Sequence, residues 1–159
     1  MKVGLISDTH GIWRAEIEAI FDGVEEIFHA GDVGAAEILE RLRGIAPVTA
    51  VRGNVDEFGE VATLPSEVRT NVGGVRFLMR HVGATAQAMP HDLKRLLALE
   101  QIQVFVFGHS HRPHSEYLGD TLLLNPGAAG PRRFSLPLSV ATLQIDGNGI
   151  TPRFWHLKE

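Results

Sequence analysis

The chain has 159 residues, of which 44% are hydrophobic and 21% charged, which is ordinary for a single compact globular domain over residues 1–159. Its formal net charge of −4 gives no general electrostatic reason to bind nucleic acid or an anionic membrane surface. Because there is no cysteine, disulfide frameworks, thiolate zinc sites and cysteine nucleophiles are excluded.

The first half of the chain alternates between predicted strands and helices. Residues 2–7 form a short apolar run, as expected of a strand covered on both faces. Apolar residues recur at helical spacing over 13–21, a second strand includes 27–28, a helix contains 38–42, and residues 47–52 form a third strand. This order predicts parallel strands joined by right-handed crossovers.

The second half predicts a different pattern. Residues 67–72 and 75–80 flank two glycines and form a predicted hairpin. A helix containing residues 93–97 precedes a buried strand over 104–107. Short strands then surround two predicted turns, at residues 119–120 and 146–149. A parallel half and a meandering half predict an α/β protein with two packed sheets and helices outside them.

Two further features bear on location. No apolar run approaches the roughly 20 residues that are needed to cross a bilayer. The N-terminal apolar run reaches the acidic Asp8 far too early for the core of a signal peptide. We therefore expect a cytoplasmic protein that does not contact a membrane.

Side chains of the metal-ligand type follow the ends of five predicted strands. Because open α/β sheets bind ligands beyond the carboxyl ends of their strands, these residues are expected to share one crevice. Carboxylates, imidazoles and an amide together suit first-row divalent metals. The candidate metal ligands are Asp8, His10, Asp32, Asn54, His81, His109 and His111.

Two of these segments have a local geometric rationale. In an extended chain alternate side chains share a face, so Asp8 and His10 are expected to point together, as are His109 and His111. Taken alone, Asp8 and His10 also fit a solvated turn after a strand, and a lone histidine is more often structural than a ligand. The His109–His111 pair after a buried strand is the sharpest single element.

The remaining candidates have competing interpretations. Asp32 follows a glycine and is either the N-cap of the next helix or a carboxylate that bridges two metals. Asn54 belongs either to a simple turn or to the metal site, with Asp56 behind it. His29 precedes Asp32 closely and is a candidate for supporting the ligands without binding metal.

The candidate ligands and their neighbours resemble the ordered motif series of the calcineurin-like metallophosphoesterases. In this chain the series is Asp8-x-His10, Gly31-Asp32, Gly53-Asn54, His81 and Gly108-His109-x-His111. The short chain, with Asn125-Pro126-Gly127 after the last pair, is similar to their small prokaryotic phosphodiesterase branch, to which the retromer scaffold subunit also belongs. The resemblance implies a four-layer αββα sandwich, in which two mixed β-sheets pack face to face with helices outside.

The resemblance also implies a distribution of ligands. Asp8, His10, Asp32 and His111 would hold one metal, and Asp32, Asn54, His81 and His109 the other, so that Asp32 bridges. Asp32, Asn54 and His81 would position the nucleophile and the phosphate together with the metals. Two divalent transition metal ions are implied, manganese first, with iron, nickel or zinc as alternatives. The expected reaction is in-line attack on phosphorus by a hydroxide that bridges the two metals.

Two positions depart from the family pattern. Many larger members have a histidine directly after the Gly-Asn pair that assists the leaving group, whereas this chain has Val55. We therefore expect esters whose leaving groups need little protonation to be preferred. Val82 follows His81 where glycine is common, and Gly83 comes one residue later, so the backbone there is expected to differ.

The expected function is a phosphodiesterase acting on a small phosphate ester, with no nucleic-acid partner. Two alternatives are open: a phosphomonoesterase, and a non-catalytic interaction scaffold with the same fold. Loss of ligands would be expected in a scaffold, and here all seven positions are filled. Arg132 and Arg133 either contact phosphate oxygens or are solvated surface residues. A homo-oligomer is compatible with the sequence.

Overall fold

The computed structural model describes residues 1–158. Within this range, none of the helices has the length and apolar character to cross a membrane. The elements in chain order are β1 (Lys2–Ile6), α1 (Glu16–Ile20), β2 (Glu26–His29), α2 (Ala36–Arg43), β3 (Val48–Ala50), the 3₁₀ helix η1 (Gly59–Thr63), β4 (Glu67–Val72), β5 (Val75–Val82), α3 (His91–Leu99), β6 (Val104–Gly108), β7 (His114–Leu118), β8 (Thr121–Asn125), β9 (Ser139–Asp146) and β10 (Gly149–His156).

The strands form two mixed five-stranded sheets. The first has the order β10-β9-β1-β2-β3, and the second has the order β4-β5-β6-β8-β7. In the first sheet β1, β2 and β3 are parallel, and in the second β5, β6 and β8 are parallel. Each sheet therefore presents several strand carboxyl ends at one edge, where the predicted site lies.

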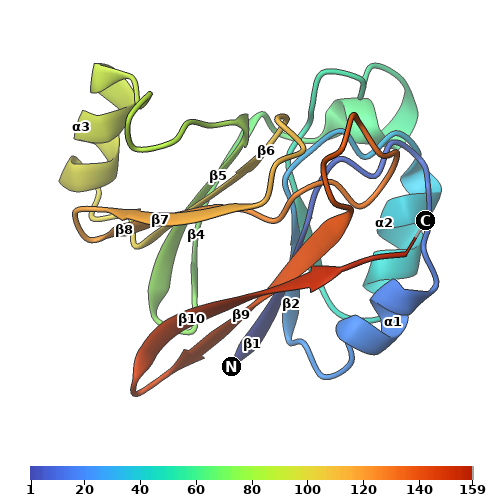
Figure 1. Cartoon of the computed structure of the whole chain (residues 1–159), viewed down its shortest axis with the longest axis horizontal. Coiled ribbons are helices and arrows are strands. Elements are labelled where there is room, and N and C mark those ends of the chain that lie inside the picture. The colour runs from blue at the N-terminus through green and yellow to red at the C-terminus, as the bar shows by residue number, and fades with distance from the viewer. Residues whose placement is uncertain (159) are drawn as a thin grey trace.

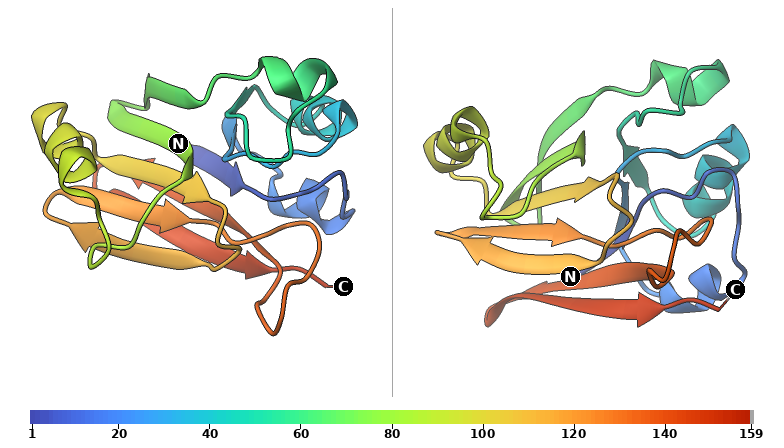
Figure 2. Two further views of the ribbon diagram at one scale, coloured as in Figure 1. Left: turned by 90° about the horizontal axis from the view of Figure 1, so that it is seen from above. Right: turned by 45° about the horizontal axis from the view of Figure 1, so that its top comes forward.

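The two sheets pack face to face, with helices on their outer faces (Figures 1 and 2). Side chains of the inner faces form one core, which includes Leu5 and Phe28 of the first sheet and Phe77 of the second. Alternate residues point outward: Ile27 packs with α1 and α2, and Phe105 packs with α3. Three apolar layers separate four structural layers, so the predicted αββα sandwich is confirmed.

Several element boundaries differ from the sequence expectation. The helix expected over 13–21 is regular only over Glu16–Ile20, although Trp13 still packs against the outer core of the first sheet. The third strand is shorter than 47–52, at Val48–Ala50. The helix η1 was not predicted, because it buries a single residue, Val61, and carries no helical repeat.

Candidate metal centre

Six of the seven candidate ligands lie in loops at the shared edge of the two sheets, and His81 lies near the end of β5. Asp8 and His10 follow β1, and His109 and His111 follow β6, but neither pair is in an extended segment. All four residues have left-handed backbone conformations, with φ of 55°, 46°, 71° and 60° in that order. The expectation that strand alternation pairs these side chains is therefore wrong: tight turns bring them together. Asp32 is also left-handed, with φ of 54°, and such strain concentrates at functional sites.

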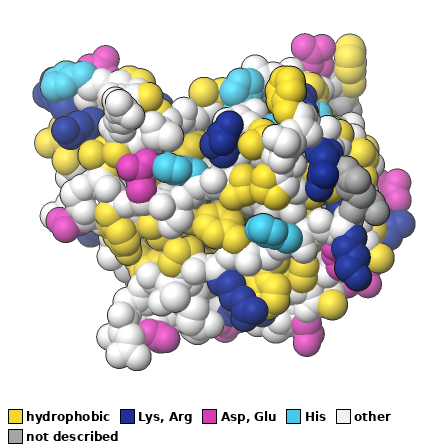
Figure 3. Space-filling view, in the orientation of Figure 1, with side chains coloured by type: hydrophobic (Ala, Val, Ile, Leu, Met, Phe, Trp, Pro, Cys, Tyr) yellow, Lys and Arg dark blue, Asp and Glu magenta, His cyan; other side chains and the backbone are white. Residues whose placement is uncertain are grey.

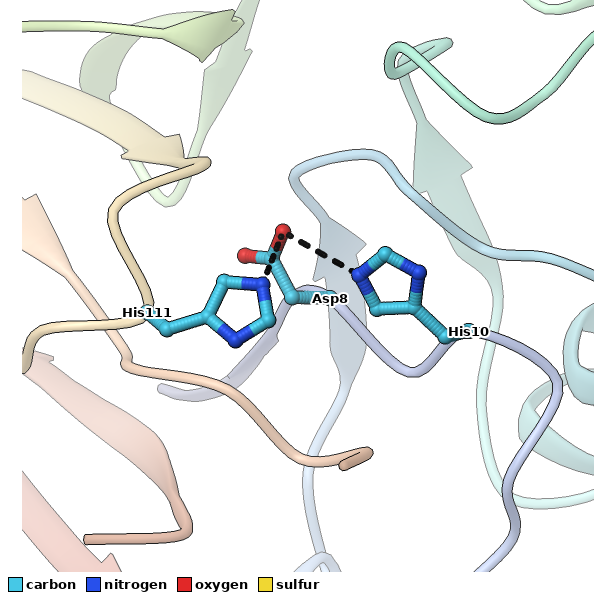
Figure 4. A group of neighbouring side chains, drawn as sticks. All are labelled: Asp8, His10 and His111. Carbon is cyan, nitrogen blue, oxygen red and sulfur yellow. Dashed lines mark ion pairs between the residues drawn. The ribbon is translucent and has the colours of Figure 1, made fainter. Parts of the chain in front are cut away.

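One group of side chains joins loops from both sheets. Ligand atoms of Asp8, His10 and His111 all lie within 4.8 Å of one another. Figure 4 shows the two imidazole rings approaching one carboxylate oxygen of Asp8 from opposite sides. That oxygen, Oδ1, lies 3.4 Å from Nε2 of His111 and 4.0 Å from Nε2 of His10. Three donor atoms therefore converge on one point.

A second group lies beside the first. It contains Asp32, His81 and His109, whose ligand atoms also lie within 4.8 Å of one another. Oδ2 of Asp32 is 3.3 Å from Nε2 of His81 and 3.6 Å from Nε2 of His10. Because His10 belongs to the first group, Asp32 stands between the two groups, where a bridging carboxylate would be needed.

Each carboxylate has one oxygen fixed by hydrogen bonds and one directed at the imidazoles. Oδ2 of Asp8 accepts from the Ser7 hydroxyl at 2.7 Å and from the His109 N–H at 3.1 Å. Oδ1 of Asp32 accepts from the Val55 N–H at 3.0 Å. Helix α2 begins after Ala35 without a side-chain cap, so the interpretation of Asp32 as its N-cap is wrong. The carboxylates are oriented before any cation binds.

Burial and neighbouring charges shift the ionisation of these groups. Burial raises the pKa of Asp32, but the His81 ring and the Val55 N–H outweigh it and hold this pKa well below its usual value. For Asp8, the His111 ring and the Ser7 hydroxyl likewise outweigh burial and lower the pKa. Both carboxyls are therefore ionised at neutral pH and attract a cation.

His81 is oriented by a hydrogen bond on the far side of its ring. Its Nδ1 donates to the Ala30 carbonyl at 2.7 Å, which leaves Nε2 directed at Asp32. Burial lowers the pKa of His81, but the Asp32 carboxylate and the Ala30 carbonyl outweigh it, so the pKa is raised. Binding of a cation at Nε2 would therefore release a proton.

The backbone around His81 differs from a regular strand. The register of β5 against β6 shifts by one residue between Met79 and Val82, which is a bulge of the kind that re-aims side chains near sites. His81 is buried while Val82 is exposed. A Cβ on Gly83 would lie 2.3 Å from the Phe107 ring, so this glycine is needed one position later than in the family pattern.

Asn54 and its neighbours complete the edge of the second group. Asn54 and His81 line the same groove. The side chain of Val55 is exposed, and its N–H is the donor to Asp32. Asp56 is buried and accepts from the N–H groups of Val33, Gly34 and Gly53, so it ties together two loops of the site rather than pointing into it.

Buried polar atoms test whether these residues fit a metal. Within residues 1–158, Oδ1 of Asp8, Nε2 of His10 and both ring nitrogens of His111 are buried without a hydrogen-bond partner. Buried polar groups are normally paired, and here Oδ1 of Asp8 and Nε2 of His111 face each other at 3.4 Å. A donor set of carboxylate oxygens and imidazole nitrogens fits divalent transition metals. The residues therefore fit the metals that the sequence resemblance implies.

Three residues outside the ligand set were also named from the sequence, and one of them holds a ligand loop. Nδ2 of Asn125 donates to the Gly108 carbonyl and the Ser110 hydroxyl, both at 3.1 Å, and so holds the turn between His109 and His111. Arg132 and Arg133 are exposed. Burial is the main cause of the lowered pKa of His10, and the charge of Arg133 adds to it, so this arginine lies within electrostatic reach of the site.

His29 supports both ligand loops, and both of its ring nitrogens are engaged in doing so. Its Nδ1 accepts from the Gly31 N–H at 3.2 Å, which places the proton on Nε2. Nε2 is 3.0 Å from the Thr9 hydroxyl, which in turn donates to the Val33 carbonyl. The ring is fully buried, and burial lowers its pKa to about 4.

We expect His29 to make the metal-free protein less stable in mild acid. The unfolded chain takes up a proton here below about pH 6.5, whereas the folded chain does so only near pH 4. The free energy of unfolding should therefore fall between these values by up to roughly 3 kcal/mol and be unaffected by this group above them. Urea unfolding in the presence of a chelator measures this fall.

His29→Gln is the matched variant for this measurement. The glutamine amide can still donate to Thr9 but does not titrate. The free energy of unfolding of the variant should therefore depend less steeply on pH between about pH 4 and 6.5 than that of the wild type. Other groups that titrate are common to both proteins and cancel in the difference. Parallel curves for the two proteins would contradict the prediction.

Comparisons with known proteins show what this chain is similar to. The model of the calcineurin-like phosphoesterase superfamily domain matches residues 1–148. A probable metallophosphoesterase of Methanothermobacter thermautotrophicus is 40% identical over 153 residues, covering 92% of this chain and 87% of that protein. A phosphodiesterase of Escherichia coli K12 is 28% identical over 164 residues, with 92% and 89% covered. Among solved structures, Vps29 of Entamoeba histolytica complexed with Zn²⁺ has a TM-score of 0.74 and 19% identity, covering 98% and 99%.

Proposed function

This chain belongs to the calcineurin-like phosphoesterase superfamily, and we propose that it is a phosphodiesterase that depends on two divalent transition metal ions. The observation that carries the proposal is the pair of adjacent ligand groups, with Asp32 reaching toward both. Manganese is the first metal expected, with iron, nickel or zinc as alternatives. Both sheets contribute ligands, which supports one functional domain over residues 1–159, and we propose that it acts in the cytoplasm.

The proposed roles are those that the family resemblance implies, and the two ligand groups are compatible with them. Asp8, His10, Asp32 and His111 hold one metal, and Asp32, Asn54, His81 and His109 hold the other. When bound, such a pair of metals lowers the pKa of a shared water and offsets charge on the phosphoryl oxygens. The protein positions these groups in advance, because Ser7, Val55 and Ala30 fix the unused atoms of the ligands.

Diester hydrolysis is favoured over monoester hydrolysis by the names of similar proteins, such as the E. coli phosphodiesterase. The likeness to Vps29 supports a second candidate at the level of fold, a protein-interaction scaffold. The complete set of donor atoms favours catalysis. On the face shown in Figure 3, lysine and arginine side chains are interspersed with other residues and form no continuous stripe, which favours a small ester over nucleic acid as the substrate.

Metal removal and re-addition tests the proposal. After chelation we expect no turnover of bis(p-nitrophenyl) phosphate, and recovery on addition of Mn²⁺, with p-nitrophenyl phosphate hydrolysed more slowly. The released nitrophenolate is followed by absorbance for each added metal. A protein that binds two metals and hydrolyses neither ester with any of them would favour the scaffold.

A further inference from the structure

A groove opens directly beside the second ligand group. It has a volume of about 530 Å³ and includes Asn54 and His81 in its wall, so one substituent of a phosphorus atom held at the metals would enter it. The rest of its lining is rich in side chains that carry charge. Its other residues are Arg52, Gly53, Ser66, Glu67, Arg80 and Val82.

The charges of the groove favour an anion. Nε of Arg80 donates a hydrogen bond to Oε1 of Glu67 at 2.6 Å. The other carboxylate oxygen of Glu67, Oε2, forms an ion pair with Nη2 of Arg69 at 3.1 Å. Arg52 is exposed and donates one N–H to the Ala62 carbonyl at 3.3 Å. Over residues 1–158 its other guanidinium N–H groups have no protein partner, and they are suited to bind phosphate oxygens in pairs.

The groove contains no evident acid to protonate a leaving group. Arginine does not give up its proton at neutral pH, and the Ser66 hydroxyl is far too weak an acid for this role. Glu67 is held by two guanidinium groups as an acceptor. Val55 adds no proton donor from the neighbouring loop. A leaving group in this groove must therefore depart as a stable anion.

We propose, building on the phosphodiesterase function above, that this groove binds a second phosphoryl group and that the preferred bond is a phosphoanhydride of the nucleoside diphosphate type. Water oxygen forms a bond to one phosphorus, and the bond from that phosphorus to the bridging oxygen breaks. The bridging oxygen keeps the electron pair and leaves as a phosphate monoester, and the water proton passes to solvent. Because the last pKa of such a phosphate is about 6, no acid is required, and Arg52 binds the anion.

Three substrates of the Mn²⁺-loaded protein test this assignment. They are ADP-ribose, with a phosphate leaving group, thymidine 5′-p-nitrophenyl phosphate, with an aryl leaving group, and thymidylyl-3′,5′-thymidine, with an alkyl leaving group. We expect kcat/KM for ADP-ribose to exceed that for the dinucleotide at least 100-fold. Arg52→Gln should lower kcat/KM for ADP-ribose by about 10- to 100-fold and for the aryl ester only a few-fold, with Arg52→Lys between wild type and Arg52→Gln.

A binding measurement provides a readout that does not depend on turnover. By calorimetry, the wild type should bind α,β-methylene-ADP at least 10-fold more tightly than AMP, and Arg52→Gln should lose this difference. Arg41→Gln, which removes an exposed arginine paired with Glu37 on α2, should retain both the activity and the difference.

The outcomes separate the two proposals. If the aryl ester is hydrolysed but ADP-ribose is not, or if Arg52→Gln affects both substrates and both ligands equally, the phosphoryl subsite is wrong and the phosphodiesterase function stands. Failure to hydrolyse all three substrates with every metal would overturn the proposed function and this inference with it.

Discussion

Asp32→Asn should lower kcat by about 1,000-fold or more while the protein remains folded. The variant keeps a carbonyl oxygen for the Val55 N–H, which orients the amide as the carboxylate is oriented now. Its NH₂ group then faces His10 and His81 in place of Oδ2, which lies 3.6 and 3.3 Å from them. An amide nitrogen cannot ligate a metal, and one negative charge is lost between the two cations. Metal ions stabilise the transition state of phosphoryl transfer by several kcal/mol, and a loss of about 4 kcal/mol corresponds to the expected 1,000-fold fall in kcat.

Metal analysis gives the second readout for this variant. Wild-type protein should retain two metal ions per chain after desalting, and Asp32→Asn should retain at most one. Asp120→Asn, at the exposed turn between β7 and β8, makes the same chemical change away from the site and should match the wild type in both measurements. If Asp32→Asn keeps two metals and half of the activity, Asp32 is not the bridge.

The fold was largely predictable because its strands obey simple rules. Alternation in β5 places Phe77 and Met79 in the central core and Leu78 toward α3, which follows from the two-residue period of a strand. The crossovers of the first half determine that β1, β2 and β3 are parallel. The start of helix α1 was harder to predict, since Trp13 continues the apolar pattern of the helix but lies before its first residue.

The identities of the candidate ligands were also predictable, because residues after parallel strands share one edge of the sheet. The backbone shape that unites them was not. Asp8 and His109 are left-handed, a conformation that non-glycine residues adopt rarely and that the surrounding packing must impose. A Cβ on Gly108, the last residue of β6, would lie 2.1 Å from the hydroxyl of Ser7, which follows β1 in the other sheet.

The groove and the ties between loops were missed for a related reason. Arg52 and Arg80 are far apart in sequence and look like ordinary surface residues until β3 and β5 bring them together. Asp56 was noticed only as a neighbour of Asn54. Its partners come from another loop, and hydrogen bonds of a carboxylate to distant backbone leave no pattern in the sequence.

Asp56→Ala should have the largest effect on stability. The variant leaves the N–H groups of Val33, Gly34 and Gly53 without the buried acceptor that now binds them at 2.8 to 3.1 Å. Each unsatisfied group costs about 1–3 kcal/mol, so we expect a loss of about 4 kcal/mol or more in the free energy of unfolding. Such a loss is a large part of the stability of a typical domain, and chemical unfolding of the chelated protein measures it.

Two matched variants show whether the loss comes from buried hydrogen bonds. Asp56→Asn keeps the oxygen that serves Val33 and Gly53 and loses only the bond to Gly34, so about 1–2 kcal/mol is expected. Asp146→Ala removes an exposed carboxylate that also accepts a backbone N–H, from Asn148, and should cost less than about 0.5 kcal/mol.

The loop that contains Gly34 packs tightly against the ligand loop, because a Cβ on Gly34 would lie 2.4 Å from the His10 backbone. Release of the Gly34 loop in Asp56→Ala should therefore also displace His10. Metal affinity should therefore fall in the order of the stability losses, and equal affinity in all three variants would show that Asp56 stabilises the fold without shaping the site.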